Sequence, residues 1–273
     1  EGLVKFDGQK FHHWNFEQGL PKAMCMEILA HDDGSIYIAS FGGGLIRYRD
    51  DKFKLLIPSN EPYSKYVYSI DMDKDGRIWV GSGFKGLYSL KDSVFTFYSG
   101  ENGISDLRIF DIQSDINKGI WLSTELGLGR ILNDSFTRYE EIPQFTAQNS
   151  HKLFPDKTGD IWFNMGNKTY QFNGNTFDVY DLKDGIIEGT NICINPTIDN
   201  HIWVGTYGGG IKQINPGGFK HIDRRRNFSE NITISMAKDK GGRKWYGTNM
   251  GELIKQDANQ YSFYEDIAFL DGA

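Results

Sequence analysis

The sequence predicts an all-β fold made of repeated four-stranded sheets, and three observations lead to it. First, one pattern recurs six times, with 42, 42, 41, 41 and 42 residues between its aromatic anchors. Second, glycine contributes 32 of 273 residues, about 12% against a usual ~7%. Third, aromatic residues make up 14% of the chain and proline only 7 residues. Many short strands joined by tight glycine turns have this composition.

The anchors of the repeat are one tyrosine and five tryptophans, a register that chance would rarely produce. Three of them close a segment of the form Asp-x-x-Gly-x-x-Trp, at residues 73–79, 156–162 and 239–245. We expect the aspartate to cap backbone N–H groups of a tight turn and the glycine to accept a positive φ. The anchors are Tyr37, Trp79, Trp121, Trp162, Trp203 and Trp245.

Each repeat divides into four short strands, called here its first to fourth strands. In the second repeat they are expected at residues 66–72, 77–81, 86–90 and 94–98. The link between second and third strands is rich in glycine, as at 41–44, 83–86 and 207–210. The link between third and fourth strands carries Asp, Asn or Gly, as in Asp50-Asp51 and Asn133-Asp134.

Four strands per ~42 residues is the period of a β-propeller blade. Such a sheet is apolar on both faces, and stacking against its copies buries both, with the tryptophans between neighbouring sheets. We expect residues 1–273 to form a single β-propeller domain with six complete blades at 23–264. Residues 1–14 read as the third and fourth strands of a closing blade and 265–273 as its start. This predicts seven blades with one composite blade, unless the chain is cut from a longer array.

Charge and hydropathy exclude several classes of protein. A net charge of −6 and a pI near 5.5 supply no basic face, so no nucleic acid is expected as a partner. No run of 18 apolar residues occurs, so direct membrane insertion of this segment is not expected. Cys25 and Cys193 are too few for a disulfide scaffold. Because the chain begins at Glu1 without a signal-type segment, we expect a processed or excised piece.

Two short motifs have a simpler structural explanation than a cofactor or metal site. Residues 81–86 match G-x-G-x-x-G, but a dinucleotide site needs a helix after it and a strand is expected here. Residues 71–76 resemble the start of a calcium loop, but position 82 is Ser82 where that loop needs glutamate. Neither the histidines nor the cysteines show catalytic or metal-ligand spacing. The sequence therefore predicts no catalytic residue, no metal and no cofactor.

Up-and-down connectivity sorts the connections onto two faces. One face, called here the loop face, carries the links between second and third strands. It also carries the links from a fourth strand to the next first strand. The shorter links share the opposite turn face. Since loop variation on one face of a scaffold usually marks binding, the candidate ligand-binding residues lie on the loop face. They are Trp14, Phe41, Tyr63, Phe84, Lys85, Arg108, Tyr207, Arg224 and Arg225.

The candidate residues suit a neutral or an acidic sugar as the ligand. Aromatic rings can stack on the apolar faces of sugars, and arginine can bind carboxylate or sulfate through two hydrogen bonds. Arg224, Arg225 and Arg226 concentrate charge in an acidic chain. A solvated loop is the favoured explanation, and contact with an anionic sugar or with a partner's acidic surface is the alternative. The first strands place polar residues at one equivalent position, where ordered water is an alternative to a ligand. They are Glu27, Ser69, Asp111, Lys152, Cys193 and Ser235.

The repeat resembles the two-component regulator propeller repeat. Residues 73–81 and 202–211 carry its Ile-Trp-Val-Gly core, and 208–210 its triple glycine. The resemblance covers nearly the whole chain, while 126–129 and 165–169 depart from the triple glycine. The Gly-His and Trp-Asp pairs of WD40 repeats are absent from these motifs.

The resemblance implies the periplasmic sensor region of a hybrid two-component histidine kinase of Bacteroides type, in a parent anchored in the inner membrane. It implies a non-catalytic chain that recognises an oligosaccharide, with the kinase elsewhere in the parent. The implied protein partners are a second copy, as a homodimer, or a neighbouring propeller of the same parent chain. Two alternatives stay open: a structural or protein-interaction propeller without a small ligand, and a propeller lyase or glycosidase.

Overall fold

The computed structural model describes the repeats and leaves parts of their connections aside. It describes residues 2–21, 24–56, 65–84, 86–98, 104, 108–117, 119–139, 152–165, 168–181, 191–196, 201–206, 210–215, 218–222, 233–248, 251–257 and 260–265. The chain divides into two compact units, Glu1–Thr146 (unit 1) and Ala147–Ala273 (unit 2). Within the described part of the chain, no helical segment has the length and hydropathy of a membrane span.

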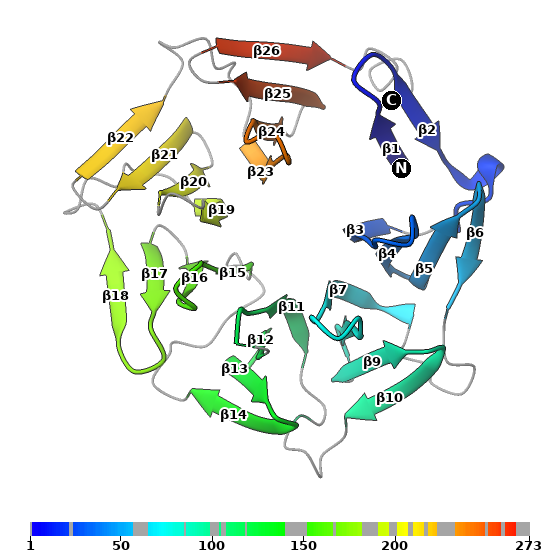
Figure 1. Cartoon of the computed structure of the whole chain (residues 1–273), viewed down its shortest axis with the longest axis horizontal. Helices are drawn as coiled ribbons and strands as arrows, with labels where there is room; N and C mark the ends of the chain where they lie inside the picture. The colour runs from blue at the N-terminus through cyan, green and yellow to red at the C-terminus, as the bar shows by residue number, and fades with distance from the viewer. Residues whose placement is uncertain are drawn as a thin grey trace. The chain divides into compact units, whose positions relative to one another are not determined.

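Unit 1 contains one two-stranded and three four-stranded antiparallel sheets (Figure 1). The small sheet pairs β1 (Leu3–Phe6) with β2 (Phe11–Trp14), and a 3-10 turn, η1 (Phe16–Gln18), follows it. The next sheet has β3 (Met24–Ala30), β4 (Ile36–Phe41), β5 (Gly44–Arg49) and β6 (Lys52–Leu55). Then come β7 (Val67–Met72), β8 (Ile78–Ser82), β9 (Leu87–Lys91) and β10 (Val94–Tyr98). The last has β11 (Ile109–Ser114), β12 (Ile120–Thr124), β13 (Gly127–Leu132) and β14 (Ser135–Tyr139).

Unit 2 contains three four-stranded antiparallel sheets, each with its strands in chain order. They are β15 (Leu153–Pro155), β16 (Ile161–Met165), β17 (Lys168–Phe172) and β18 (Phe177–Tyr180); β19 (Asn191–Pro196), β20 (Ile202–Thr206), β21 (Gly210–Asn215) and β22 (Gly218–Ile222); and β23 (Thr233–Lys238), β24 (Lys244–Thr248), β25 (Glu252–Asp257) and β26 (Gln260–Glu265). The fold is thus a β-propeller of four-stranded blades, with six such sheets described and a seventh blade not confirmed.

The hydrophobic core lies between consecutive sheets, as the repeat predicts. Tyr37 of β4 packs with Ile70 and Val80 of the next sheet, and Trp79 of β8 packs with Ile112 and Leu122 of the sheet after it. In unit 2, Trp162 packs with Ile194 and Val204, and Trp203 packs with Tyr246 and Ile254. Strands β8, β12 and β20 are buried along their whole length. A single sheet therefore shields neither of its faces by itself.

One aspartate in each of four repeats ties the tight turn to the buried tryptophan. Asp73 Oδ1 accepts the N–H groups of Asp75 and Arg77, at 3.0 and 2.9 Å. Its Oδ2 accepts the Trp79 indole N–H at 2.9 Å. Gly76 completes the turn with a φ of 74°. The same indole bond recurs in the pairs Asp115–Trp121, Asp156–Trp162 and Asp239–Trp245.

These bonds decide between the two explanations of the motif at 71–76. Asp73 and Asp75 belong to the hairpin turn between β7 and β8, and Asp71 lies in β7, as the absence of a loop glutamate indicated. At 81–86 the chain runs from β8 into strand β9, so no helix opens after the glycines. The nucleotide reading of that motif therefore lacks its structural context.

Only one end of the predicted closing blade lies among the described residues. The two strands expected within residues 1–14 form as β1 and β2. Leu3 of β1 is buried with Leu20, Ile38 and Ile46, which attaches the small sheet to β4 and β5. Residues 266–273, where the closing blade should begin, lie outside the described residues. The single domain over 1–273 and its composite seventh blade stay predictions.

Candidate ligand-binding face

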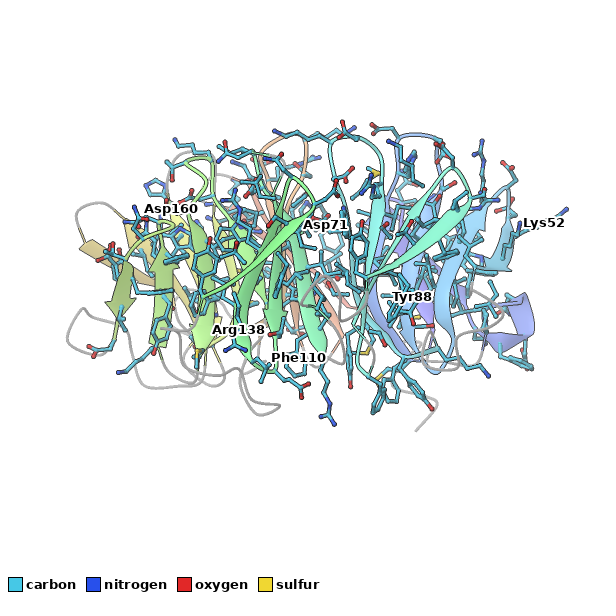
Figure 2. All side chains as sticks on the ribbon, turned by 90° about the horizontal axis from the view of Figure 1, so that it is seen from below. Lys52, Asp71, Tyr88, Phe110, Arg138 and Asp160 are labelled. Carbon is cyan, nitrogen blue, oxygen red and sulfur yellow. The ribbon has the colours of Figure 1, made fainter. Side chains whose placement is uncertain are left out.

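The loop face predicted from connectivity is present in unit 1. The end of each second strand pairs with the start of the first strand of its sheet, so the two kinds of loop meet there. Gly42 N–H donates to the Lys65 carbonyl at 2.9 Å and joins neighbouring sheets at this level. Figure 2 shows Phe110 at this lower edge of the unit, with Asp71 nearer the opposite edge. The end pairs are Met24–Phe41, Val67–Ser82 and Ile109–Thr124.

Five aromatic side chains of three consecutive sheets contact one another on this face and are called the aromatic row. Ring centroids are 4.9 Å apart for Phe41 and Tyr66, and 4.9 Å apart for Tyr66 and Phe84. A second line runs from Phe41 to Tyr68 at 5.7 Å and from Tyr68 to Phe110 at 6.4 Å. Phe84 is 41% exposed, and the other four rings are half-buried. The row thus presents a continuous aromatic surface that solvent reaches.

β-Bulges place two of these rings. The ladder of each first strand in unit 1 slips by one residue, between Cys25 and Glu27, Val67 and Ser69, and Ile109 and Asp111. The skipped residues are Met26, Tyr68 and Phe110. A bulge takes a residue out of the pairing and re-aims its side chain. Three neighbouring first strands therefore each supply one large apolar side chain at the start of the strand.

Gly83 makes room for the central ring of the row. A Cβ at this position would overlap the Tyr68 ring, and Gly83 N–H donates to the Tyr66 carbonyl at 2.9 Å. The glycine-rich link between β8 and β9 therefore lies directly against the aromatic row. Glycine is needed at this site for a close approach and not for an unusual φ.

An arginine and a glutamate lie at one end of the row. The Arg108 guanidinium carbon lies 5.7 Å from the centre of the Phe84 ring, a cation–π distance. Glu125 accepts the Arg108 backbone N–H at 3.2 Å, and its other oxygen is 3.8 Å from Arg108 Nε. Half of the Arg108 side chain is exposed. The pair has little net charge and offers hydrogen-bond donors and acceptors beside the aromatic row.

A polar ladder joins the first strands behind the bulges. Ser69 Oγ donates to Glu27, lies 3.0 Å from Asp111 Oδ1 and accepts the Ile112 N–H at 3.0 Å. Glu27 also accepts the Ile70 N–H at 2.9 Å. Because Ser69 and Asp111 are fully buried, these groups hold neighbouring sheets together. In unit 1 the polar positions predicted as a possible small-ligand site thus serve inter-sheet bonding.

Asp71 extends this ladder toward the turn face. Its carboxylate accepts the Ser114 N–H at 2.5 Å, and the Ser114 hydroxyl donates to the Met72 carbonyl at 3.1 Å. Burial raises the pKa of Asp71 above its usual 3.8. Burial also raises the pKa of the Cys193 thiol to about 12, which disfavours its thiolate form.

The structure brings together three of the nine predicted site residues. Phe41, Phe84 and Arg108 are connected through Tyr66. Trp14 lies apart from them and packs on Tyr48, with centroids 5.4 Å apart, and on the core of the first sheet. The remaining predicted residues lie outside the described part of the chain; they are Tyr63, Lys85, Tyr207, Arg224 and Arg225.

The predicted set left out four residues of the site. Tyr66, Tyr68, Phe110 and Glu125 contact the row or Arg108. A signal for two of them is present in the sequence, because positions 26, 68 and 110 directly precede the aligned polar positions and are all large and apolar. Only the bulge, which no sequence pattern marks, sends them to the loop face.

Comparisons with known proteins agree with the repeat and the fold. A family model described as two component regulator propeller matches residues 62–84. No curated protein matches the sequence. Virginiamycin B lyase from Staphylococcus aureus is similar in structure, with a TM-score of 0.72, 18% identity and coverage of 90% of this chain and 85% of that one. The protein YCF48, solved bound to D1 peptide, has a TM-score of 0.73, 12% identity and coverage of 93% and 84%.

A third similar structure comes from B. thetaiotaomicron and is described as the extracellular domain of a hybrid two component system. The TM-score is 0.66 at 15% identity, and the match covers 94% of this chain and 41% of that one. At these identities the solved structures establish the propeller fold and no activity. The family model confirms the resemblance predicted from the repeat at residues 62–84, and the fold is a β-propeller.

Proposed function

We propose that this chain is a non-catalytic, extracytoplasmic ligand-binding propeller of a two-component sensor, and that its aromatic row binds an oligosaccharide. The observation that carries the proposal is the row itself, five touching rings beside the Arg108–Glu125 pair. Contiguous, partly exposed rings often mark a binding site, and sugars present apolar faces that suit them.

The row also has the chemical composition of a sugar site. Sugar rings combine C–H faces with hydroxyl groups, so their sites pair aromatic surface with a few fixed donors and acceptors. Phe84 supplies the exposed ring, and Arg108 with Glu125 supplies both hydrogen-bonding senses within about one sugar unit of it. Gly83 lets the Tyr68 ring lie directly against the backbone of the link between β8 and β9, which fixes this ring within the row.

The proposal that this chain is part of a larger two-component sensor rests on the repeat. Its match at 62–84 and the B. thetaiotaomicron neighbour support a periplasmic sensor region in a parent anchored in the inner membrane. Within such a parent the kinase would lie elsewhere. Signalling would require the oligosaccharide to bind one arrangement of protomers more tightly than another, because equal affinity shifts no equilibrium.

The test is calorimetric titration of the chain with a panel of neutral and acidic oligosaccharides. For a sugar that binds, Phe84→Ala is expected to weaken affinity about tenfold, which corresponds to ~1.4 kcal/mol. Phe263→Ala is the matched control, because Phe263 is equally exposed at 41% and lies on β26, outside the row. If both variants bind alike, the row is not the site.

A second candidate is a peptide-binding propeller without a small ligand. The YCF48 structure with D1 peptide shows that a protein of this fold can carry a peptide, at 12% identity to this chain. Aromatic rings with a nearby arginine suit peptides as well as sugars. A peptide array in parallel with the sugar panel separates the two. Binding of peptides but no sugar would favour this candidate.

A further inference from the structure

The fourth strand β10 is unusual among the edge strands of the molecule. It lies at the outer end of its sheet, paired only with β9 (Figure 1). Its sequence is Val-Phe-Thr-Phe-Tyr, without a formal charge. The fourth strands of the other five described four-stranded sheets each carry at least one Lys, Arg, Asp or Glu. Charged residues on an edge normally prevent pairing with another chain.

The strand also presents apolar side chains to solvent. Val94 is 64% exposed and Phe97 is 40% exposed, and Thr96 between them is exposed as well. Tyr98 and Phe95 point into the inter-sheet cores, where they pack with Trp79 and with the preceding cluster. Phe97 also contacts the Tyr88 ring of β9, with centroids 4.9 Å apart. Among the described residues, the rest of the Phe97 surface, Val94, Thr96 and the unpaired backbone edge of β10 stay open to solvent.

We propose that β10 is a self-association edge, on which two copies of this chain pair antiparallel about Thr96. In this register Thr96 faces Thr96 of the second copy, Phe95 faces Phe97, and Val94 faces Tyr98. Threonine pairs and aromatic pairs stabilise antiparallel strands, and no like charges are opposed. The same arrangement at β6, about the equivalent residue Lys54, would bring Lys54 against Lys54 of the other copy. Self-pairing thus suits β10 and is disfavoured at β6.

A second copy fits this edge better than an unrelated strand, because the sequence is nearly symmetric about its centre. A two-fold axis through Thr96 makes both copies use the same residues, as in an isologous dimer. Two five-residue strands bury less than the ~1,000 Å² of a stable interface. The association is therefore weak and depends on concentration, and it would be strengthened where a parent chain confines two copies together.

Strand β14 provides a matched control within the same chain. Its sequence Ser-Phe-Thr-Arg-Tyr aligns with β10, and Tyr139 stacks on Trp121 as Tyr98 does on Trp79. The two strands differ only at the first and fourth positions, where Ser135 and Arg138 replace Val94 and Phe97. The double variant Val94→Ser/Phe97→Arg therefore gives β10 the residues that a neighbouring sheet already accommodates.

The experiment is sedimentation velocity of the whole chain from about 1 μM to about 1 mM, in the concentration regime of a weak dimer. The average mass is expected to rise from 31.1 kDa toward twice that value. For Val94→Ser/Phe97→Arg the dissociation constant should increase at least tenfold, and a cooperative thermal transition checks that the variant is folded. A monomer at every concentration, or equal dimerisation of the variant, overturns the proposal.

A cross-link tests the register and distinguishes β10 pairing from nonspecific association. Thr96→Cys should form a disulfide-linked dimer under mild oxidation, because opposite Cβ atoms in an antiparallel pair lie ~4.5–5.5 Å apart. Thr137→Cys, at the equivalent position of β14, should form no disulfide-linked dimer, and neither should the wild-type chain with Cys25 and Cys193. Equal cross-linking of both cysteine variants, or capture of other proteins at β10 without dimer, contradicts a two-fold β10 interface.

Discussion

In four repeats, the aspartate that precedes the tryptophan by six residues stabilises both the turn and the core. In the fourth repeat, Asp156 accepts the Thr158 N–H at 2.8 Å, the Asp160 N–H at 3.1 Å and the Trp162 indole N–H at 2.9 Å. Asp156→Ala leaves a buried indole donor without its acceptor. We expect a loss of about 2–4 kcal/mol in the free energy of unfolding, measured by urea denaturation. A loss below 1 kcal/mol would mean that water replaces the carboxylate.

In the fifth repeat the aspartate is missing from the sequence, so it can be introduced and not removed. The Trp203 indole Nε1 is buried and has no hydrogen-bond partner among the described residues, while Lys244 Nζ lies 3.9 Å from the ring centre. In the sequence, Thr197 stands six residues before Trp203, where four other repeats have aspartate. Thr197→Asp is expected to stabilise the chain by about 1 kcal/mol, seen as a higher urea midpoint. Unchanged stability would show that this indole is satisfied without the carboxylate.

Two other aspartates should respond to pH in opposite directions. Burial raises the pKa of Asp71, so its protonated form favours the fold; that contribution is complete below pH 3.8 and is lost as the pH rises through the raised pKa. Asp71→Asn keeps an acceptor for Ser114 and removes the titration. Relative to wild type, the variant should therefore gain stability between about pH 3 and pH 7 in urea titrations. A constant difference across that range contradicts the shift.

The pKa of Asp239 is shifted in the direction opposite to that of Asp71. The Trp245 indole bond, followed by the contacts with Arg243, lowers the pKa of Asp239 to about 2. Its carboxylate therefore stabilises the fold above pH 3.8, and this contribution disappears as the pH falls toward about 2. Asp239→Asn should be less stable than wild type at neutral pH and approach it in acid, in the same urea titrations.

At the scale of the strand pair, the turns between third and fourth strands carry backbone strain. Asp92 and Ser93 both have positive φ, 49° and 65°, as required for a two-residue hairpin. Asn-Gly adopts this geometry with less strain, so Asp92→Asn/Ser93→Gly is expected to raise the free energy of unfolding by about 1 kcal/mol. The measurement is thermal and urea unfolding of the folded chain. Destabilisation would show that the Asp92 or Ser93 side chain makes a needed contact.

The strands themselves could be predicted from the sequence closely, because each is bounded by turn chemistry. The expected ranges 66–72, 77–81, 86–90 and 94–98 differ by at most one residue at each end from β7, β8, β9 and β10. The candidate site was predicted less well. Phe84 and Arg108 lie in loops that the topology already assigns to one face, and Phe41 ends β4 where such a loop begins. Tyr68 and Phe110 lie within strands, and their side chains reach the site only through bulges set by ladder hydrogen bonding.

At the scale of the whole molecule, stability depends on neighbouring sheets and not on any single repeat. Strand β8 is buried along its length, with Trp79 and Ile112 on one side and Val80 and Tyr37 on the other. In such a one-dimensional array an isolated repeat loses both interfaces. A peptide of residues 65–98 is therefore expected to be unfolded by circular dichroism, whereas residues 24–139, with three repeats, should show sheet signal and a cooperative thermal transition. A cooperative transition in the single-repeat peptide would contradict stabilisation by stacking, because that peptide contains no second sheet to cover its apolar faces.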